Sequence, residues 1–238
     1  DPCYISVGDY AANETVYEAY LGLEAPGEGG GSGEGEGGGS GSLSSNAYGF
    51  SAHTVGGWTQ LDFVNGQYEL RAKSDLSIVA AEYVDGYVFH VASDGMAYVA
   101  PNGNPNARVA LGDLSAYGVQ DMSFNYADKQ MYVLGANNTV YTMDLSSAAL
   151  TEAFTVSVIN TKNAACTTLR GLAVDEEGNF YVSTDGGSGY EFAAQIFKFT
   201  LDMVTDGAIT DLNPMGTGYI GGYTDNGQTL AWDYENDK

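Results

Sequence analysis

The chain has 238 residues, of which 8 are Lys or Arg and 31 are Asp or Glu, giving a formal net charge of −23. So few cations exclude a nucleic-acid binder, which displaces counterions from phosphates with basic side chains, and they argue against docking on anionic lipid. No run reaches the roughly 20 apolar residues of a membrane-spanning helix, so membrane insertion is not expected. The length fits one domain or two small ones.

Two short strands are predicted before residue 27. Residues 4–7 and 15–21 are rich in β-branched and aromatic side chains. Because 26 residues cannot form an independent core, we expect residues 1–26 to be the end of an upstream β-domain. Cys3 and Cys166 lack metal-binding spacing. A disulfide between them is one possibility, and two separate thiols, with Cys3 pairing upstream, is the interpretation that we favour.

Residues 27–42 consist of ten Gly, three Ser and three Glu. This segment has no apolar side chain to bury, so nothing offsets the entropy lost on ordering it. We predict a flexible linker that extends to residue 45. A phosphate-binding loop is excluded because no Lys follows with the spacing GxxxxGK[ST]. Beyond it, residues 48–52, 58–63 and 67–70 are predicted to form three less regular strands.

From residue 76 onward the sequence is organised in repeats. Each repeat contains short β-rich segments separated by turn residues, and Asp85-Gly86 is typical of a two-residue hairpin turn. The strand groups recur about every 45–55 residues, as propeller blades do, whereas a β-sandwich lacks such self-similarity. We therefore predict an all-β fold: a partial β-propeller of four-stranded antiparallel blades, preceded by a short β tail and a Gly-rich linker. The propeller would span 46–238, with an irregular first blade at 46–75, blades at 76–115, 116–160 and 161–215, and a truncated blade beginning at 216–238.

Two segments resemble known propeller families. Residues 171–185, Gly-Leu-Ala-Val-Asp-Glu-Glu-Gly-Asn-Phe-Tyr-Val-Ser-Thr-Asp, followed by 195–199, resemble an NHL-type repeat. Residues 230–238 are similar to the opening of a blade of the low-density-lipoprotein-receptor YWTD class. The resemblance implies a ring of about six blades, of which about four are present here. Since the chain starts at Asp1 and stops inside a repeat, we expect a piece of a longer protein, whose remainder completes the ring.

The densest acidic turn contains Asp175, Glu176 and Glu177. Asp175 is expected to cap this turn by accepting backbone N–H bonds. Weak structural calcium binding by these three residues is the alternative, although the DxDxDG spacing of a calcium loop is missing.

Few other side chains are candidates for chemistry. His53 and His90 lack the spacing of a zinc site. Trp58 and Tyr190, which lie near Gly-rich loops, are the aromatic residues expected to be exposed for ligand binding. No catalytic or cofactor motif occurs, so no catalytic residue and no cofactor is predicted.

The composition, with 33 Gly, 18 Tyr and few Lys, indicates an acidic bacterial protein that is extracellular or on the cell surface. We expect a non-catalytic interaction or scaffold module that binds a protein or a glycan through propeller loops. Two alternatives remain open. One is a propeller enzyme domain, a metal-dependent hydrolase or lyase whose site is completed outside this chain. The other is a purely structural spacer.

Overall fold

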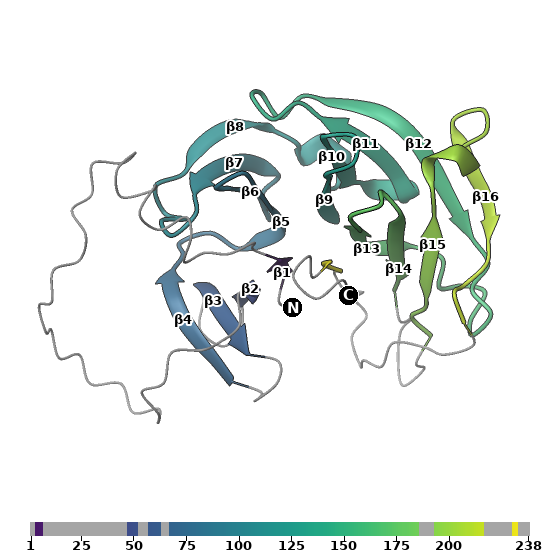
Figure 1. Cartoon of the computed structure of the whole chain (residues 1–238), viewed down its shortest axis with the longest axis horizontal. Coiled ribbons are helices and arrows are strands. Elements are labelled where there is room, and N and C mark those ends of the chain that lie inside the picture. The colour runs from purple at the N-terminus through teal and green to yellow at the C-terminus, as the bar shows by residue number, and fades with distance from the viewer. Residues whose placement is uncertain are drawn as a thin grey trace, which may run out of the picture.

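The computed structural model describes residues 3–6, 47–51, 57–62, 67–185, 193–216 and 230–232. Within these ranges the chain is all-β, apart from short 3-10 turns at Ser115–Tyr117, Ala136–Asn138 and Leu201–Met203. The strands form four sheets that follow one another along an arc around a common centre (Figure 1). The first strand of each sheet lies at this centre, beside the first strand of the next sheet. The fold is therefore a partial β-propeller.

The first blade contains, in order, β1 (Cys3–Ser6), β2 (Ala47–Ser51), β3 (Gly57–Asp62) and β4 (Gln67–Lys73). β1 pairs antiparallel with β2, with Cys3 opposite Phe50. Residues 3–6 therefore belong to the first blade and not to an upstream domain, because a strand too short for its own core finds backbone partners by joining a sheet. The rest of 1–26, including the strand predicted at 15–21, lies outside the described residues. The Gly-rich segment 27–45 thus connects two strands of one blade. The segment itself, with its predicted flexibility, lies outside the described residues.

The second blade and the first four strands of the third lie within 76–115 and 116–160, respectively. Asp85 and Gly86, with φ of 46° and 93°, form the tight turn between the first two strands of the second blade. The second blade contains β5 (Ile78–Val84), β6 (Tyr87–Ala92), β7 (Met96–Pro101) and β8 (Val109–Asp113). The third contains β9 (Asp121–Asn125), β10 (Gln130–Leu134), β11 (Thr139–Met143) and β12 (Leu150–Val158).

The fourth blade has three strands, β13 (Leu169–Val174), β14 (Phe180–Thr184) and β15 (Ile196–Phe199). The next strand, β16 (Ala208–Leu212), instead pairs parallel with β12, so the third blade has five strands. This corrects the prediction of four antiparallel strands in 161–215. Pro214 and Met215 lie beside β15 where a fourth strand would pair. The Met215 N–H donates to the Ile196 carbonyl at 2.9 Å. Proline has no N–H for a ladder, so no strand forms there.

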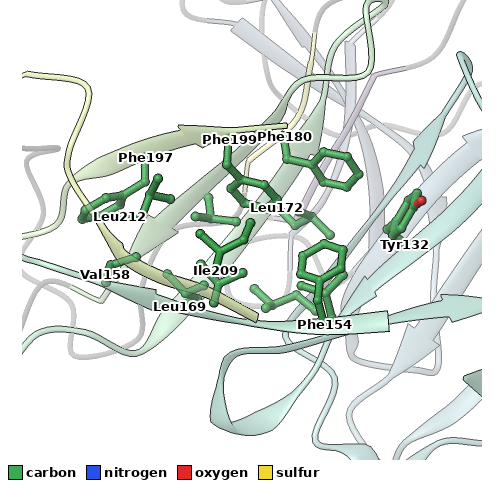
Figure 2. Close-up of a cluster of buried hydrophobic side chains, with 14 of the residues drawn as sticks. Tyr132, Phe154, Val158, Leu169, Leu172, Phe180, Phe197, Phe199, Ile209 and Leu212 are labelled. Atoms are coloured by element: carbon green, nitrogen blue, oxygen red, sulfur yellow. The ribbon is translucent and has the colours of Figure 1, made fainter. Parts of the chain in front are cut away.

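The apolar layer between the third and fourth blades takes side chains from both (Figure 2). Phe180 stacks on Phe199 with ring centroids 5.1 Å apart, and Phe154 meets Phe180 edge-on at 6.2 Å. Ile209 and Leu212 of β16 are buried in the same layer, which explains why β16 stays with the third blade. Similar layers join the second blade to the third and the first to the second.

Residues 230–232 lie against the inner part of the fourth blade. The Leu230 N–H donates to Asp121 Oδ2 at 3.2 Å, and Trp232 stacks on Tyr181 with centroids 5.1 Å apart. The other residues of the predicted truncated blade, from 217 on, lie outside the described residues. Among the described residues, no helix is long and apolar enough to span a membrane.

Candidate functional site at the inner strands

The inner strands of successive blades are joined by side chains that accept backbone hydrogen bonds. The Phe124 N–H donates to Glu82 Oε2 at 3.3 Å, and one blade further the Val174 N–H donates to Ser123 Oγ at 3.1 Å. The Leu172 N–H donates to Asp121 Oδ2 at 2.9 Å. An innermost strand has one edge without a neighbouring strand, and its N–H groups need acceptors when they are buried. These polar side chains supply the acceptors and hold β5, β9 and β13 in register.

Two carboxyl groups are therefore buried at the centre of the fold. Glu82 is 8% exposed and Asp121 only 1%. Burial raises the pKa of Glu82 to about 8. Hydrogen bonds from Tyr83 N–H, Phe124 N–H and Ser123 favour the charged form and oppose this rise. The nearby Asp121 also raises the pKa. At a pKa of about 8 the neutral form of Glu82 predominates at pH 7, so its burial beside Asp121 does not require a charged Glu82.

A second polar group, formed by Gln120, Arg170 and Asp185, lies at the start of β9 and β13. Arg170 Nη1 donates to Gln120 Oε1 at 2.6 Å, whereas its buried Nε has no hydrogen-bond partner. Asp185 is brought alongside because its N–H donates to the Thr168 carbonyl, two residues before Arg170. Its buried Oδ1 has no hydrogen-bond partner either. Burial raises the pKa of Asp185, while the charge of Arg170 opposes that rise.

This group, which we call the Arg170 site, offers an unfilled donor and an unfilled acceptor. A buried polar atom without a partner costs about 1–3 kcal/mol. A ligand that brings one acceptor and one donor to Arg170 Nε and Asp185 Oδ1 would recover part of that cost. Sugar hydroxyl pairs and the amides of proteins both carry this combination.

Asp175, predicted as a turn cap, has that geometry. Its Oδ1 accepts the N–H groups of Glu177 and Asn179 at 3.0 and 2.8 Å, and its Oδ2 accepts the Tyr181 hydroxyl at 3.0 Å. Burial works against ionisation of Asp175, but its hydrogen bonds, led by those from Asn179, hold its pKa below the usual value. Glu176 and Glu177 are exposed. Within the described ranges, no three His, Cys, Asp or Glu side chains gather into a metal site.

Trp58 is not exposed, which corrects the expectation for this residue. It is 5% exposed and meets Phe50 and His90 edge-on, with centroids 5.5 and 5.6 Å away. The second blade covers β3, so a nearby glycine does not indicate a surface position. His90 also lies in this layer, stacked on Tyr98, and burial lowers its pKa to about 4.

The remaining predicted residues give less information. Tyr190 and His53 lie outside the described residues. Cys166 is buried in the loop before β13, and the side chain of Cys3, its possible disulfide partner, is outside the described part.

The residues of the inner strands and of the Arg170 site were not predicted. A signal for the inner strands is present, because Glu82, Asp121 and Ser123 are polar residues inside short apolar strands. Arg170 and Asp185 are fifteen positions apart in the chain and meet through the pairing of β13 with β14. Sequence spacing alone does not reveal that contact.

No family model and no curated protein matches the chain. Among solved structures, a chain of the nidogen/laminin complex is similar at 11% identity and a TM-score of 0.44, covering 63% of this chain and 57% of that one. The N-terminal domain of Nup159 is similar at 10% identity and a TM-score of 0.40, covering 71% and 45%. A Saccharomyces cerevisiae assembly of Dbp5 with Nup159 and Gle1 contains a chain at 10% identity and a TM-score of 0.41, covering 70% and 44%.

The present chain thus spans about half the length of these similar chains. Such low identities and TM-scores do not indicate a shared function.

Proposed function

We propose that this chain is a non-catalytic interaction module that binds a protein or a glycan at the Arg170 site. The supporting observation is that Arg170 Nε and Asp185 Oδ1 are buried, are brought together by neighbouring strands and have no hydrogen-bond partner. Because the inner strands are cross-linked by Glu82, Asp121 and Ser123, the site is supported by ordered backbone, which lowers the entropy cost of binding.

We further propose an extracellular or cell-surface location on a bacterium, and a relationship to the NHL- or YWTD-type propellers. The support is compositional for the location: a net charge of −23 with 33 Gly and 18 Tyr. For the relationship it is the resemblance of residues 171–185 and 230–238 to blade sequences, together with the blade arrangement. The remainder of the same polypeptide would then complete the ring.

An enzyme is the second candidate, and Glu82 is the observation in its favour. A carboxyl group with a pKa of about 8 beside a second carboxylate is an arrangement that enzymes use for acid and base chemistry. Against this, Oε1 and Oε2 of Glu82 accept backbone N–H groups, and the residue is 8% exposed. Both carboxyl oxygens of Glu82 are thus already engaged by the backbone, whereas Arg170 Nε and Asp185 Oδ1 have no hydrogen-bond partner, so we favour binding without catalysis.

The test is to screen the full chain against arrays of defined oligosaccharides and of peptides, then to repeat the screen with Arg170→Gln. Arg71→Gln is the matched control, since Arg71 contacts Gln60 and Glu69 on the first blade, away from the Arg170 site. Loss of one charge-assisted hydrogen bond should weaken binding about tenfold or more. The bound compound should be recovered unchanged.

Three results would contradict the proposal. They are the absence of binding on both arrays, equal binding by wild type and Arg170→Gln, and chemical conversion of the bound compound. The last result would support the enzyme alternative, and the first would support a structural spacer.

A further inference from the structure

The outer strands of the second and third blades have equivalent positions but different neighbours. β12 of the third blade pairs with β16, which adds a fifth strand in parallel. β8 of the second blade is the last strand of its sheet and lies on the outer rim (Figure 1). This chain therefore shows, in its own third blade, that an outer strand of this architecture can accept another strand.

The outer edge of β8 is open among the described residues. Ala110 is exposed and Val109 is 63% exposed, the highest value among the large apolar side chains described. Half of the backbone groups of a terminal strand point away from its sheet, and an extended chain can pair with them. A register shift between Ala97 and Tyr98 interrupts the pairing of β7 with β8, but β12 has a similar shift and still pairs with β16.

The outermost strand of the third blade, β16, is protected. β16 contains Asp211, which has φ of 54° and places an exposed charge inside the strand. Both a backbone irregularity and a charge hinder the addition of a further strand. No residue of β8 has a positive φ, so β8 remains an extended edge.

Aspartates surround the C-terminal end of β8. Asp113 is its last residue, and Asp94 lies in the adjacent turn, which is held by a 2.8 Å bond from Leu114 N–H to the Gly95 carbonyl. Asp144 caps the turn that contains Ser147. This turn packs against β8 at Gly112, so closely that a Cβ added to Gly112 would lie 2.9 Å from the Ser147 carbonyl oxygen. Hydrogen bonds from Ser115, and from Ser146 and Ser147, lower the pKa of Asp113 and of Asp144. The edge is therefore next to negative charge at neutral pH.

We propose that β8 is a docking strand for an extended segment of a partner protein, in which apolar residues alternate with Lys or Arg. The apolar side chains would cover Val109, and the cations would face Asp94, Asp113 and Asp144. A second copy of this chain is a poor partner, since each copy carries a net charge of −23. The proposal is independent of the Arg170 site.

The test uses a short labelled peptide of alternating Val and Lys and the same peptide with N-methylated backbone amides. Both peptides carry the same charges, so a difference in their affinities reports the backbone hydrogen bonds of strand pairing. Binding to the full chain would be followed by fluorescence anisotropy, and the site located by amide hydrogen exchange. We expect slower exchange within Val109–Asp113. N-methylation should weaken binding about tenfold or more, because backbone hydrogen bonds are lost.

A paired set of variants tests the charge. Asp94→Asn with Asp113→Asn should weaken binding of the Val-Lys peptide and reduce its dependence on salt. Asp206→Asn with Asp211→Asn removes the same charge elsewhere, at positions with positive φ that Asn tolerates, and should leave binding unchanged. Equal binding of the N-methylated peptide, or protection outside β8, would overturn the proposal. So would equal effects of the two double variants.

Discussion

Replacing Glu82 by Gln should change how stability depends on pH. Burial raises the pKa of Glu82 from 4.5 to about 8, so the folded chain holds a proton that the unfolded chain releases between those values. The sign follows from linkage: the contribution of Glu82 to stability is complete below pH 4.5 and is lost as pH rises toward 8. One bound proton corresponds to a slope of about −1.4 kcal/mol per pH unit. The Gln variant has no such proton and should lack this slope.

The variant also loses a hydrogen bond. This loss determines the pH at which the free energies of unfolding of wild type and Glu82→Gln become equal. Glu82 Oε1 accepts the Tyr83 N–H at 2.9 Å and Oε2 accepts the Phe124 N–H at 3.3 Å. Gln has one oxygen, so one of these N–H groups would face an NH2 group, at a cost of about 1–3 kcal/mol. We therefore expect the variant to be less stable than wild type near pH 5. The difference should shrink or reverse by pH 8.

The measurement is urea unfolding, followed by tyrosine and tryptophan fluorescence at a series of pH values from 5 to 8.5. The decisive quantity is the difference between wild type and Glu82→Gln, because other titrating groups cancel in it. Glu152→Gln, at an exposed position of β12, is the control and should run parallel to wild type. Parallel curves for Glu82→Gln as well would refute a buried, protonated Glu82.

Two further predictions concern the layer between the first and second blades. Burial lowers the pKa of His90 from 6.5 to about 4, so the free energy of unfolding should decrease as pH falls through that interval. His90→Phe keeps an aromatic ring beside Tyr98 but cannot take up a proton. Urea unfolding of this variant should therefore show a smaller decrease. Trp58→Ala should lower the free energy of unfolding by about 3–5 kcal/mol, since a large buried ring leaves a cavity; a change below about 1 kcal/mol would show that Trp58 is at the surface after all.

The strands that could be predicted are those specified by local sequence. β5 and β6 are nearly continuous apolar runs on either side of Asp85-Gly86, a pair that tolerates the positive φ of the turn. β12 begins within 146–153, a segment of Ser, Ala, Leu, Thr and Glu whose composition does not by itself favour a strand. Pairing of Leu150 with Met143 places it in the sheet. β1 could not be predicted as part of the first blade, because its partner β2 follows forty residues later, beyond the Gly-rich segment.

The candidate site was less predictable than the strands, for a related reason. Asp175 caps its own turn, so its role depends on neighbours two to six residues away. The pairing of Arg170 with Gln120 joins residues fifty positions apart on separate blades. Burial of Trp58 likewise depends on His90 of the next blade. Contacts between blades decide both burial and partners, and single-strand patterns do not contain them.

The acceptors along the inner strands also show where this cross-linking ends. Asp175 comes directly after β13, and Asn125 is the last residue of β9. The two residues occupy the same position in their repeats. The residues two and four before Asn125 are Ser123 and Asp121, which accept N–H groups from β13. The corresponding residues of β13 are Ala173 and Gly171, which have no side-chain acceptor to offer a segment beyond β13. The Leu230 N–H accordingly turns to Asp121, which already accepts the Leu172 N–H, so a single carboxylate joins three inner segments.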